Sequence, residues 1–171
     1  MSENAAAGVE LLCLDVDGVM TDGSIRIDDN AVETKRFHVR DGMGIRIWTR
    51  LGYHVAIITG RSGHAVRHRA AELGIEHVIQ ASDDKAASLD AVLAKLSLQP
   101  AQAAILGDDL PDLAMLRMAG YPMAVADAVA EVRQVAAFVT THAGGDGAVR
   151  EAIEHLLSAK GRWNEAVDLF A

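Results

Sequence analysis

The chain has 171 residues, of which 50% are hydrophobic, and its 24 acidic and 16 basic side chains give a formal net charge of −8. This size and composition favour a single globular domain over residues 1–171, and the acidic balance disfavours nucleic acid as a partner. The single cysteine, Cys13, excludes an intrachain disulfide, and without a basic leader or a long apolar run we expect a cytoplasmic protein with no membrane partner.

The first predicted strand, residues 11–14 with the sequence LLCL, leads directly into Asp15, Asp17 and Gly18. Side chains alternate along a strand, so the two carboxylates project from the same side if the extended form persists to Asp17. Two like charges held close together need a cation or a shared proton, which indicates chemistry. An acidic turn at the end of a buried strand is the alternative, and this stretch alone leaves both open.

The next segment predicts a β-hairpin over about 22–37. Ile25 and Ile27 alternate with polar neighbours, residues 28–30 are typical of a turn, and a return strand follows. The helical spacing of apolar residues after the hairpin predicts a helix that ends at Gly52. The hairpin therefore projects just beyond the acidic pair.

Strands and helices alternate through the rest of the chain. Predicted strands cover 55–58, 77–80, 103–106, 123–126 and 138–140, and predicted helices cover 62–73, 83–98, 111–119, 128–136 and 148–160. This alternation predicts an α/β fold, a single doubly wound, Rossmann-like parallel sheet with helices on both faces. Ligands in such sheets bind beyond the carboxyl ends of the strands.

Potentially reactive residues recur at those strand ends. After the acidic pair come Thr59-Gly60-Arg61, then Lys85 at the start of a helix, then the run GDDLPD, which contains Asp108, Asp109 and Asp112. A lysine is electrostatically unfavourable at a helix start, which invites a functional explanation for Lys85. A capped helix start is the alternative interpretation of the three aspartates. The motifs in this order favour a metal site instead.

The order DxDG, TG, K and GDDxxD resembles the haloacid dehalogenase superfamily of phosphohydrolases, from residue 11 to about residue 150. The resemblance implies that Asp15 is a nucleophile that forms an aspartyl-phosphate and that Asp17 is the general acid and base. It also implies that Asp15, the backbone carbonyl of Asp17, and Asp108 hold Mg²⁺, an ion that prefers oxygen ligands.

The same resemblance assigns the remaining polar residues. Thr59 and Lys85 would bind the phosphoryl oxygens, with Gly60 in the same loop, and Asp109 and Asp112 would orient metal-bound water or Lys85. The intervals between these motifs leave no room for a cap domain. Superfamily members without a cap usually act on large substrates or close the site by oligomerising.

Two further segments, residues 22–48 and 141–157, are similar to the hairpin with its following helix and to the C-terminal segment of the 3-deoxy-D-manno-octulosonate 8-phosphate phosphatases. This similarity implies a homotetramer whose hairpins form an intersubunit barrel, with neighbouring subunits covering each active site. It implies release of phosphate and free octulosonate for lipopolysaccharide synthesis. Asp146 departs from the basic residue that is common at its place in that family.

Substrate contacts beyond the phosphate are assigned to two arginines. Arg61 follows the threonine motif and could bind a substrate carboxylate bidentately. Arg40 lines the pocket by resemblance, or caps the helix that follows. In the tail, about 161–171, Trp163, Val167 and Phe170 share one helical face that docks on a neighbouring subunit or packs within the chain.

Two other functions remain open at this stage. The same chemistry could act on a nonulosonate 9-phosphate of the sialic-acid type, since the motifs read the phosphate and not the sugar. Alternatively, the chain could be a non-catalytic oligomerisation module related to those of nucleotide-sugar synthetases. The presence of Asp15, Asp17, Thr59, Lys85 and Asp108 argues against that module.

Overall fold

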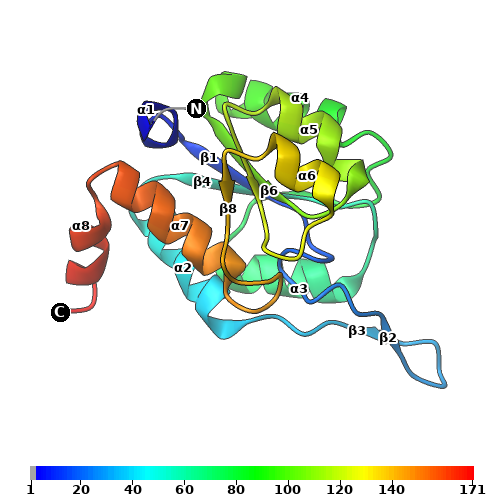
Figure 1. The fold of residues 1–171 in the computed structure, drawn as a ribbon. Coiled ribbons are helices and arrows are strands. Elements are labelled where there is room, and N and C mark those ends of the chain that lie inside the picture. The colour runs from blue at the N-terminus through cyan, green and yellow to red at the C-terminus, as the bar shows by residue number, and fades with distance from the viewer. Residues whose placement is uncertain (1–2) are drawn as a thin grey trace.

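The computed structural model describes residues 3–171 and centres on a six-stranded parallel sheet (Figure 1). The strand order is β5-β4-β1-β6-β7-β8, so β1 lies in the middle with β4 on one side and β6 on the other. The predicted doubly wound α/β fold is confirmed. The strands are β1 Leu11–Leu14, β4 His54–Ile58, β5 His77–Ile79, β6 Ala103–Gly107, β7 Tyr121–Ala124 and β8 Phe138–Val139.

Helices cover both faces of the sheet. Figure 1 shows α4, α5 and α6 on one face and α2, α3 and α7 on the other. The helices are α1 Glu3–Ala7, α2 Val39–Arg50, α3 His64–Leu73, α4 Lys85–Leu96, α5 Leu113–Met118, α6 Ala130–Val135, α7 Ala148–Ala159 and α8 Trp163–Asp168, with 3₁₀ turns η1 Pro100–Gln102 and η2 Leu110–Asp112. In residues 3–171, none of these helices has the length and apolar character needed to cross a membrane.

The core runs along the central strands. Every residue of β1, β6 and β7 is buried, as expected for parallel strands that are covered on both faces. Trp48 of α2 is fully buried, and its indole N–H donates to the carbonyl of His54, 2.8 Å away. This contact holds α2 against the amino end of β4, opposite to the carboxyl end where the candidate site lies.

The predicted hairpin is present and projects away from the sheet (Figure 1). Its ladder is short, because only β2 Arg26–Ile27 and β3 Glu33–Thr34 pair antiparallel. In the turn, Asp28 Oδ1 accepts backbone N–H groups from Asn30 and Val32. Ile25 and Ile27 are 57% and 61% exposed, so the apolar side chains of the hairpin are not covered by the rest of the chain.

Several boundaries differ from the predicted ones. The strand predicted at 123–126 is β7, which begins at Tyr121. Pro122 lies within this strand, and its carbonyl accepts the N–H of Ala137. The strand ends at Ala124 because the N–H of Ala126 turns to the carbonyl of His142 and the hydroxyl of Thr140. The helix predicted from Pro111 is divided into η2 and α5, and α1 was not predicted.

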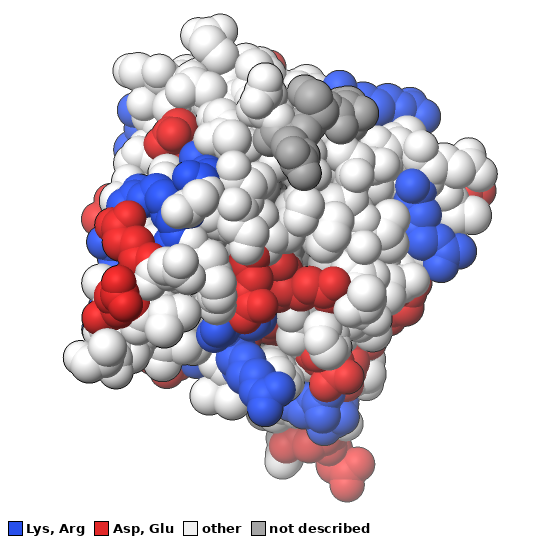
Figure 2. Space-filling model, turned by 60° about the vertical axis from the view of Figure 1, so that its left-hand side comes forward, with Lys and Arg blue, Asp and Glu red and all other residues white. Residues whose placement is uncertain are grey.

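The C-terminal tail packs within the chain. Ala166 of α8 is buried, and the guanidinium of Arg150 in α7 lies 5.2 Å from the ring centroid of Trp163. Val167 and Phe170 remain about half exposed. Trp163 and Ala166 thus pack within the chain, and docking of the tail on a neighbouring subunit stays a prediction. Acidic and basic side chains are interspersed on the face shown in Figure 2.

Candidate active site

Three strand ends meet at one edge of the sheet. Asp15 follows β1, Thr59 follows β4 and Asp108 follows β6, and β1 is paired to both neighbours. In register, Leu14 lies opposite Ile57 on one side and Leu106 on the other. The carboxyl ends of parallel strands are therefore brought side by side, which is where such sheets hold their ligands.

Lys85 joins two carboxylates at this edge. Its Nζ lies 3.0 Å from Asp15 Oδ1 and 2.6 Å from Asp112 Oδ1, and all three residues are buried. Lys85 is the first residue of α4, and the side chain of Asp84 caps the helix by accepting the N–H of Ala87. The lysine at the unfavourable end of a helix is thus compensated by the carboxylates in front of it.

Asp15, Asp108 and Asp112 form an acidic cluster, with one carboxylate oxygen from each lying within 4.8 Å of the others. Asp112 Oδ2 also accepts the backbone N–H of Asp108 at 3.0 Å. This contact needs a glycine at 107, because a Cβ there would lie 2.7 Å from the Asp112 carboxylate. Gly18 has a φ of +89°, and a Cβ on it would overlap Asp108 Oδ2. The glycine of the DxDG motif therefore makes room for Asp108.

The cluster carries more negative charge than Lys85 can offset. Burial and then the charge of Asp112 raise the pKa of Asp15 to about 6. Burial, followed by the charges of Asp112 and Asp15, raises the pKa of Asp108 to about 8. Asp108 Oδ1 is buried and accepts no hydrogen bond from residues 3–171. A divalent cation with oxygen ligands, such as Mg²⁺, fits these three observations.

The loop after β4 carries Thr59, Gly60 and Arg61. Thr59 is buried, and its hydroxyl accepts the N–H of Arg61 at 3.3 Å. The Arg61 guanidinium is half exposed, pairs with Glu33 at 2.7 Å and lies 3.8 Å from Asp17 Oδ2. Arg61 therefore reaches the Asp17 carboxylate as well as open solvent.

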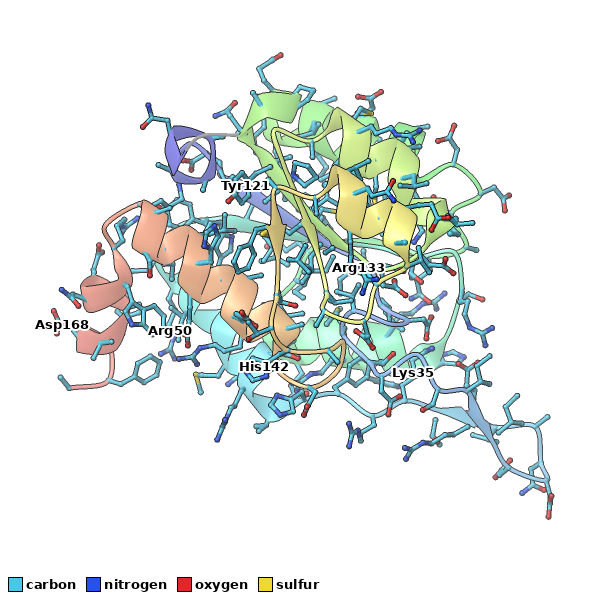
Figure 3. The ribbon with its side chains drawn as sticks, viewed as in Figure 1. Lys35, Arg50, Tyr121, Arg133, His142 and Asp168 are labelled. Carbon is cyan, nitrogen blue, oxygen red and sulfur yellow. The ribbon has the colours of Figure 1, made fainter. Side chains whose placement is uncertain are left out.

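Sequence reasoning missed two residues of the hairpin, Glu33 and Lys35. The ammonium of Lys35 forms ion pairs with Asp17 and with Glu33 Oε1. Burial lowers the pKa of Lys35, but its hydrogen bonds to these carboxylates outweigh burial and raise it. Figure 3 shows Lys35 at the base of the hairpin, below the loops of the sheet edge. The period of two along the return strand was the available signal, since it places Glu33 and Lys35 on one face.

Two predicted site residues lie apart from these contacts. The Asp109 side chain is exposed and accepts the N–H of Leu110, so it caps η2 and adds only negative charge beside Asp108. Arg40 lies exposed in the first turn of α2 and lines a different cavity of about 550 Å³. Among the described residues, His142 and Asp146 of the glycine-rich loop line the same cavity, and Figure 3 shows His142 near the start of α7.

A parallel sheet with a buried acidic cluster, a lysine and a threonine at its carboxyl edge defines a hydrolase of the haloacid dehalogenase class. The family model for haloacid dehalogenase-like hydrolases matches residues 77–153, which include Lys85, Asp108 and Asp112. The 3-deoxy-D-manno-octulosonate 8-phosphate phosphatase KdsC of Escherichia coli K12 is 45% identical over 161 residues, which cover 94% of this chain and 86% of that protein. The chain therefore belongs to the 3-deoxy-D-manno-octulosonate 8-phosphate phosphatase family.

Solved structures agree with this assignment. The crystal structure of the Moraxella catarrhalis phosphatase of this name, in complex with magnesium, phosphate and KDO, has a TM-score of 0.96 and 40% identity, and covers 99% of this chain and 97% of its own. The cobalt-bound Haemophilus influenzae enzyme has a TM-score of 0.90 and 34% identity, with 92% of each chain covered. Both relatives bind a divalent metal, as the acidic cluster predicts for this chain.

Proposed function

We propose that this protein is a Mg²⁺-dependent phosphatase that hydrolyses 3-deoxy-D-manno-octulosonate 8-phosphate to the free sugar acid and inorganic phosphate. The observation that carries the proposal is the cluster of buried Asp15, Lys85 and Asp112 with partly buried Asp108 at the carboxyl edge of the sheet. The relatives named above support the substrate, because they carry the name of this activity at 45% identity over most of the chain.

Asp15 is proposed as the nucleophile. Its carboxylate attacks phosphorus in line, the bond from phosphorus to the sugar oxygen breaks, and an aspartyl-phosphate forms on Asp15. Asp17 donates a proton to the departing sugar oxygen. Asp17 then takes a proton from water as that water attacks phosphorus, which releases inorganic phosphate and restores the Asp15 carboxylate.

The cation site is proposed to consist of Asp15, Asp108 and the backbone carbonyl of Asp17. When bound, Mg²⁺ supplies the positive charge that lets an anionic nucleophile meet an anionic phosphoryl group. Asp112 is proposed to support the cation site, since it accepts the N–H of Asp108 and pairs with Lys85 at 2.6 Å. Asp109, which caps η2, is assigned a weaker role through its charge.

Lys85, Thr59 and the backbone of Gly60 are proposed to bind the phosphoryl oxygens, since the lysine and threonine are buried at the site. Arg61 is proposed to bind the carboxylate of the sugar acid, because its guanidinium is half exposed beside Asp17. Arg40 is proposed to contact substrate only if the assembly brings its cavity to a site, since it lies apart from the acidic cluster.

We further propose a homotetramer in which hairpins pair and neighbouring subunits cover the active sites. The exposed Ile25, Ile27 and Val32 support this, because the chain itself leaves these apolar side chains uncovered. Residues 1–171 are proposed to form one hydrolase domain. A cytoplasmic location and a step in lipopolysaccharide precursor synthesis are consistent with a sugar-acid phosphate as substrate.

The test is a phosphate-release assay on the octulosonate 8-phosphate, a nonulosonate 9-phosphate and p-nitrophenyl phosphate, each with Mg²⁺ and with EDTA. We expect Mg²⁺-dependent release and the highest kcat/KM on the octulosonate. A higher kcat/KM on the nonulosonate would assign the alternative substrate. A folded tetramer that releases phosphate from none of the three would refute the enzyme and favour the non-catalytic module.

A further inference from the structure

Lys35 is a buried cation on an otherwise exposed hairpin. Its side chain is only 4% exposed, whereas its neighbour Arg36 is 57% exposed and lies 3.8 Å from Asp22. The two side chains leave the return strand in opposite directions, as alternation requires. Lys35 therefore points inward, to the carboxyl edge of the sheet.

Two carboxylates receive the Lys35 ammonium. It donates to Asp17 Oδ1 and pairs with Glu33 Oε1 at 3.0 Å. Glu33 also holds Arg61 at 2.7 Å, and the Arg61 Nε lies 3.8 Å from the other oxygen of Asp17. Each oxygen of Asp17 thus faces a cation, Lys35 or Arg61, and both cations also pair with Glu33. Breaking a buried charge pair costs far more free energy than breaking an exposed one.

Asp17 lies outside the acidic cluster. In residues 3–171 that cluster takes its carboxylate oxygens from Asp15, Asp108 and Asp112. The cations that hold Asp15 and Asp17 also differ, because Lys85 pairs with Asp15 whereas Lys35 pairs with Asp17. Two aspartates separated by one residue are therefore held by two different lysines, one from α4 and one from the hairpin.

We propose that Lys35 is a positioning residue that keeps the Asp17 carboxylate on the hairpin side of the site, away from the cation ligands, where it serves the leaving oxygen of the substrate. This inference rests on the proposed phosphatase function. It makes the hairpin part of the catalytic apparatus within its own subunit, in addition to any role in assembly. Loss of Lys35 would free Asp17 to turn toward the cation.

The proposal predicts a dependence on the leaving group. A sugar alkoxide is a poor leaving group that needs a proton from Asp17, whereas p-nitrophenolate leaves without one. Hydrolysis of the aspartyl-phosphate is common to both substrates, so the difference lies in its formation, which kcat/KM reports. Misplacing Asp17 should therefore lower kcat/KM much more for the sugar phosphate than for the aryl phosphate. A residue that only supports folding or only binds the phosphoryl group would slow both substrates alike.

The experiment compares Lys35→Met, Lys35→Arg and the matched control Arg36→Met, each confirmed by circular dichroism and by its oligomeric state. For Lys35→Met we expect kcat/KM on the sugar phosphate to fall about 100-fold and kcat/KM on p-nitrophenyl phosphate to fall less than about 10-fold. Lys35→Arg should recover part of the loss, and Arg36→Met should match the wild type on both substrates.

Equal losses of kcat/KM on the two substrates, or an unchanged kcat/KM on the sugar phosphate, would overturn the proposal. If Lys35→Met does not fold, Lys35→Gln replaces it, because glutamine removes the positive charge that faces Asp17 but keeps a polar side chain. The same selective loss supports the proposal and an unselective one overturns it. If the wild type does not hydrolyse the octulosonate 8-phosphate but cleaves p-nitrophenyl phosphate, the substrate assignment fails. Glycerol phosphate then replaces it as the substrate with an alkoxide leaving group in the Lys35 test.

Discussion

The carboxyl edge of the sheet and the hairpin are built in opposite ways. At the sheet edge, Asp15, Lys85 and Asp112 are buried and held by each other within 3.0 Å. The hairpin has a two-residue ladder and leaves Ile25 and Ile27 more than half exposed. The first region is thus complete within one chain, and the second presents an apolar surface that one chain does not cover.

The difference in burial separates the groups that act on the phosphoryl group from the groups that face solvent. Charges that act on a phosphoryl group need a fixed, water-poor frame, and the central strands supply it. Groups that recognise the rest of a substrate or a second subunit must reach solvent. Two hairpin residues link the regions, since Lys35 pairs with Asp17 and Glu33 pairs with Arg61 of the loop after β4.

The largest expected effect comes from Asp15→Asn at the sheet edge. This change removes the proposed nucleophile without changing side-chain size, so we expect kcat to fall by at least about 1,000-fold. Phosphate release on p-nitrophenyl phosphate with Mg²⁺ measures the loss, with Asp90→Asn on the exposed face of α4 as control. Robust turnover by the Asp15 variant would show that the sheet edge is not the reaction centre.

Lys85→Met should damage both activity and stability. It leaves Asp15 and Asp112 buried without their shared cation, which should cost about 3 kcal/mol in the free energy of unfolding. It also removes the proposed phosphoryl contact, which should lower kcat about 100-fold. Urea unfolding and steady-state kinetics measure the two effects. Lys95→Met, an exposed change on the same helix, is the control. An unfolding free energy equal to the wild type would contradict the described charge cluster.

The hairpin prediction concerns assembly. Changing Ile25 and Ile27 together to Ser removes apolar surface that is already exposed in the single chain. We therefore expect a shift from tetramer to smaller species by sedimentation, while circular dichroism of the subunit is unchanged. A tetramer that persists at the lowest measurable concentration would assign the assembly to another surface.

The smallest effect is a pH dependence of the metal-free protein. The pKa values of Asp15 and Asp108 are raised from 3.8 to about 6 and about 8, so the native state binds more protons than the unfolded state between those limits. The free energy of unfolding should therefore fall as pH rises from 5 to 8, and Mg²⁺ should stabilise more at pH 8 than at pH 5.

Thermal melting with and without Mg²⁺ measures this dependence. Asp108→Asn removes the group with the larger shift, so its metal-free melting temperature should change less between pH 5 and pH 8 than that of the wild type. If the metal-free wild type instead becomes more stable than this variant as pH rises over the same range, the pKa values of these carboxylates are not raised.

Sequence reasoning predicted the doubly wound sheet, the hairpin and the family, and these predictions are confirmed. The strand predicted at 123–126 lies two residues earlier, as β7 at Tyr121–Ala124, and Pro122 lies within it. The roles of Asp15, Asp17 and Asp108 stay predictions. The structure brings Asp15 and Asp108 together as those roles require and adds Asp112 to the cluster.

The sequence by itself determined which side chains follow the strands, because apolar runs, acidic pairs and glycines are local patterns. It also determined that Gly18 follows the acidic pair, although only the structure shows that Asp108 fills the space a Cβ would take. Which cation faces which carboxylate was decided by tertiary structure. Lys85 and Lys35 are separated from Asp15 and Asp17 by long stretches of chain, and only the packing of α4 and of the hairpin against the sheet edge pairs them.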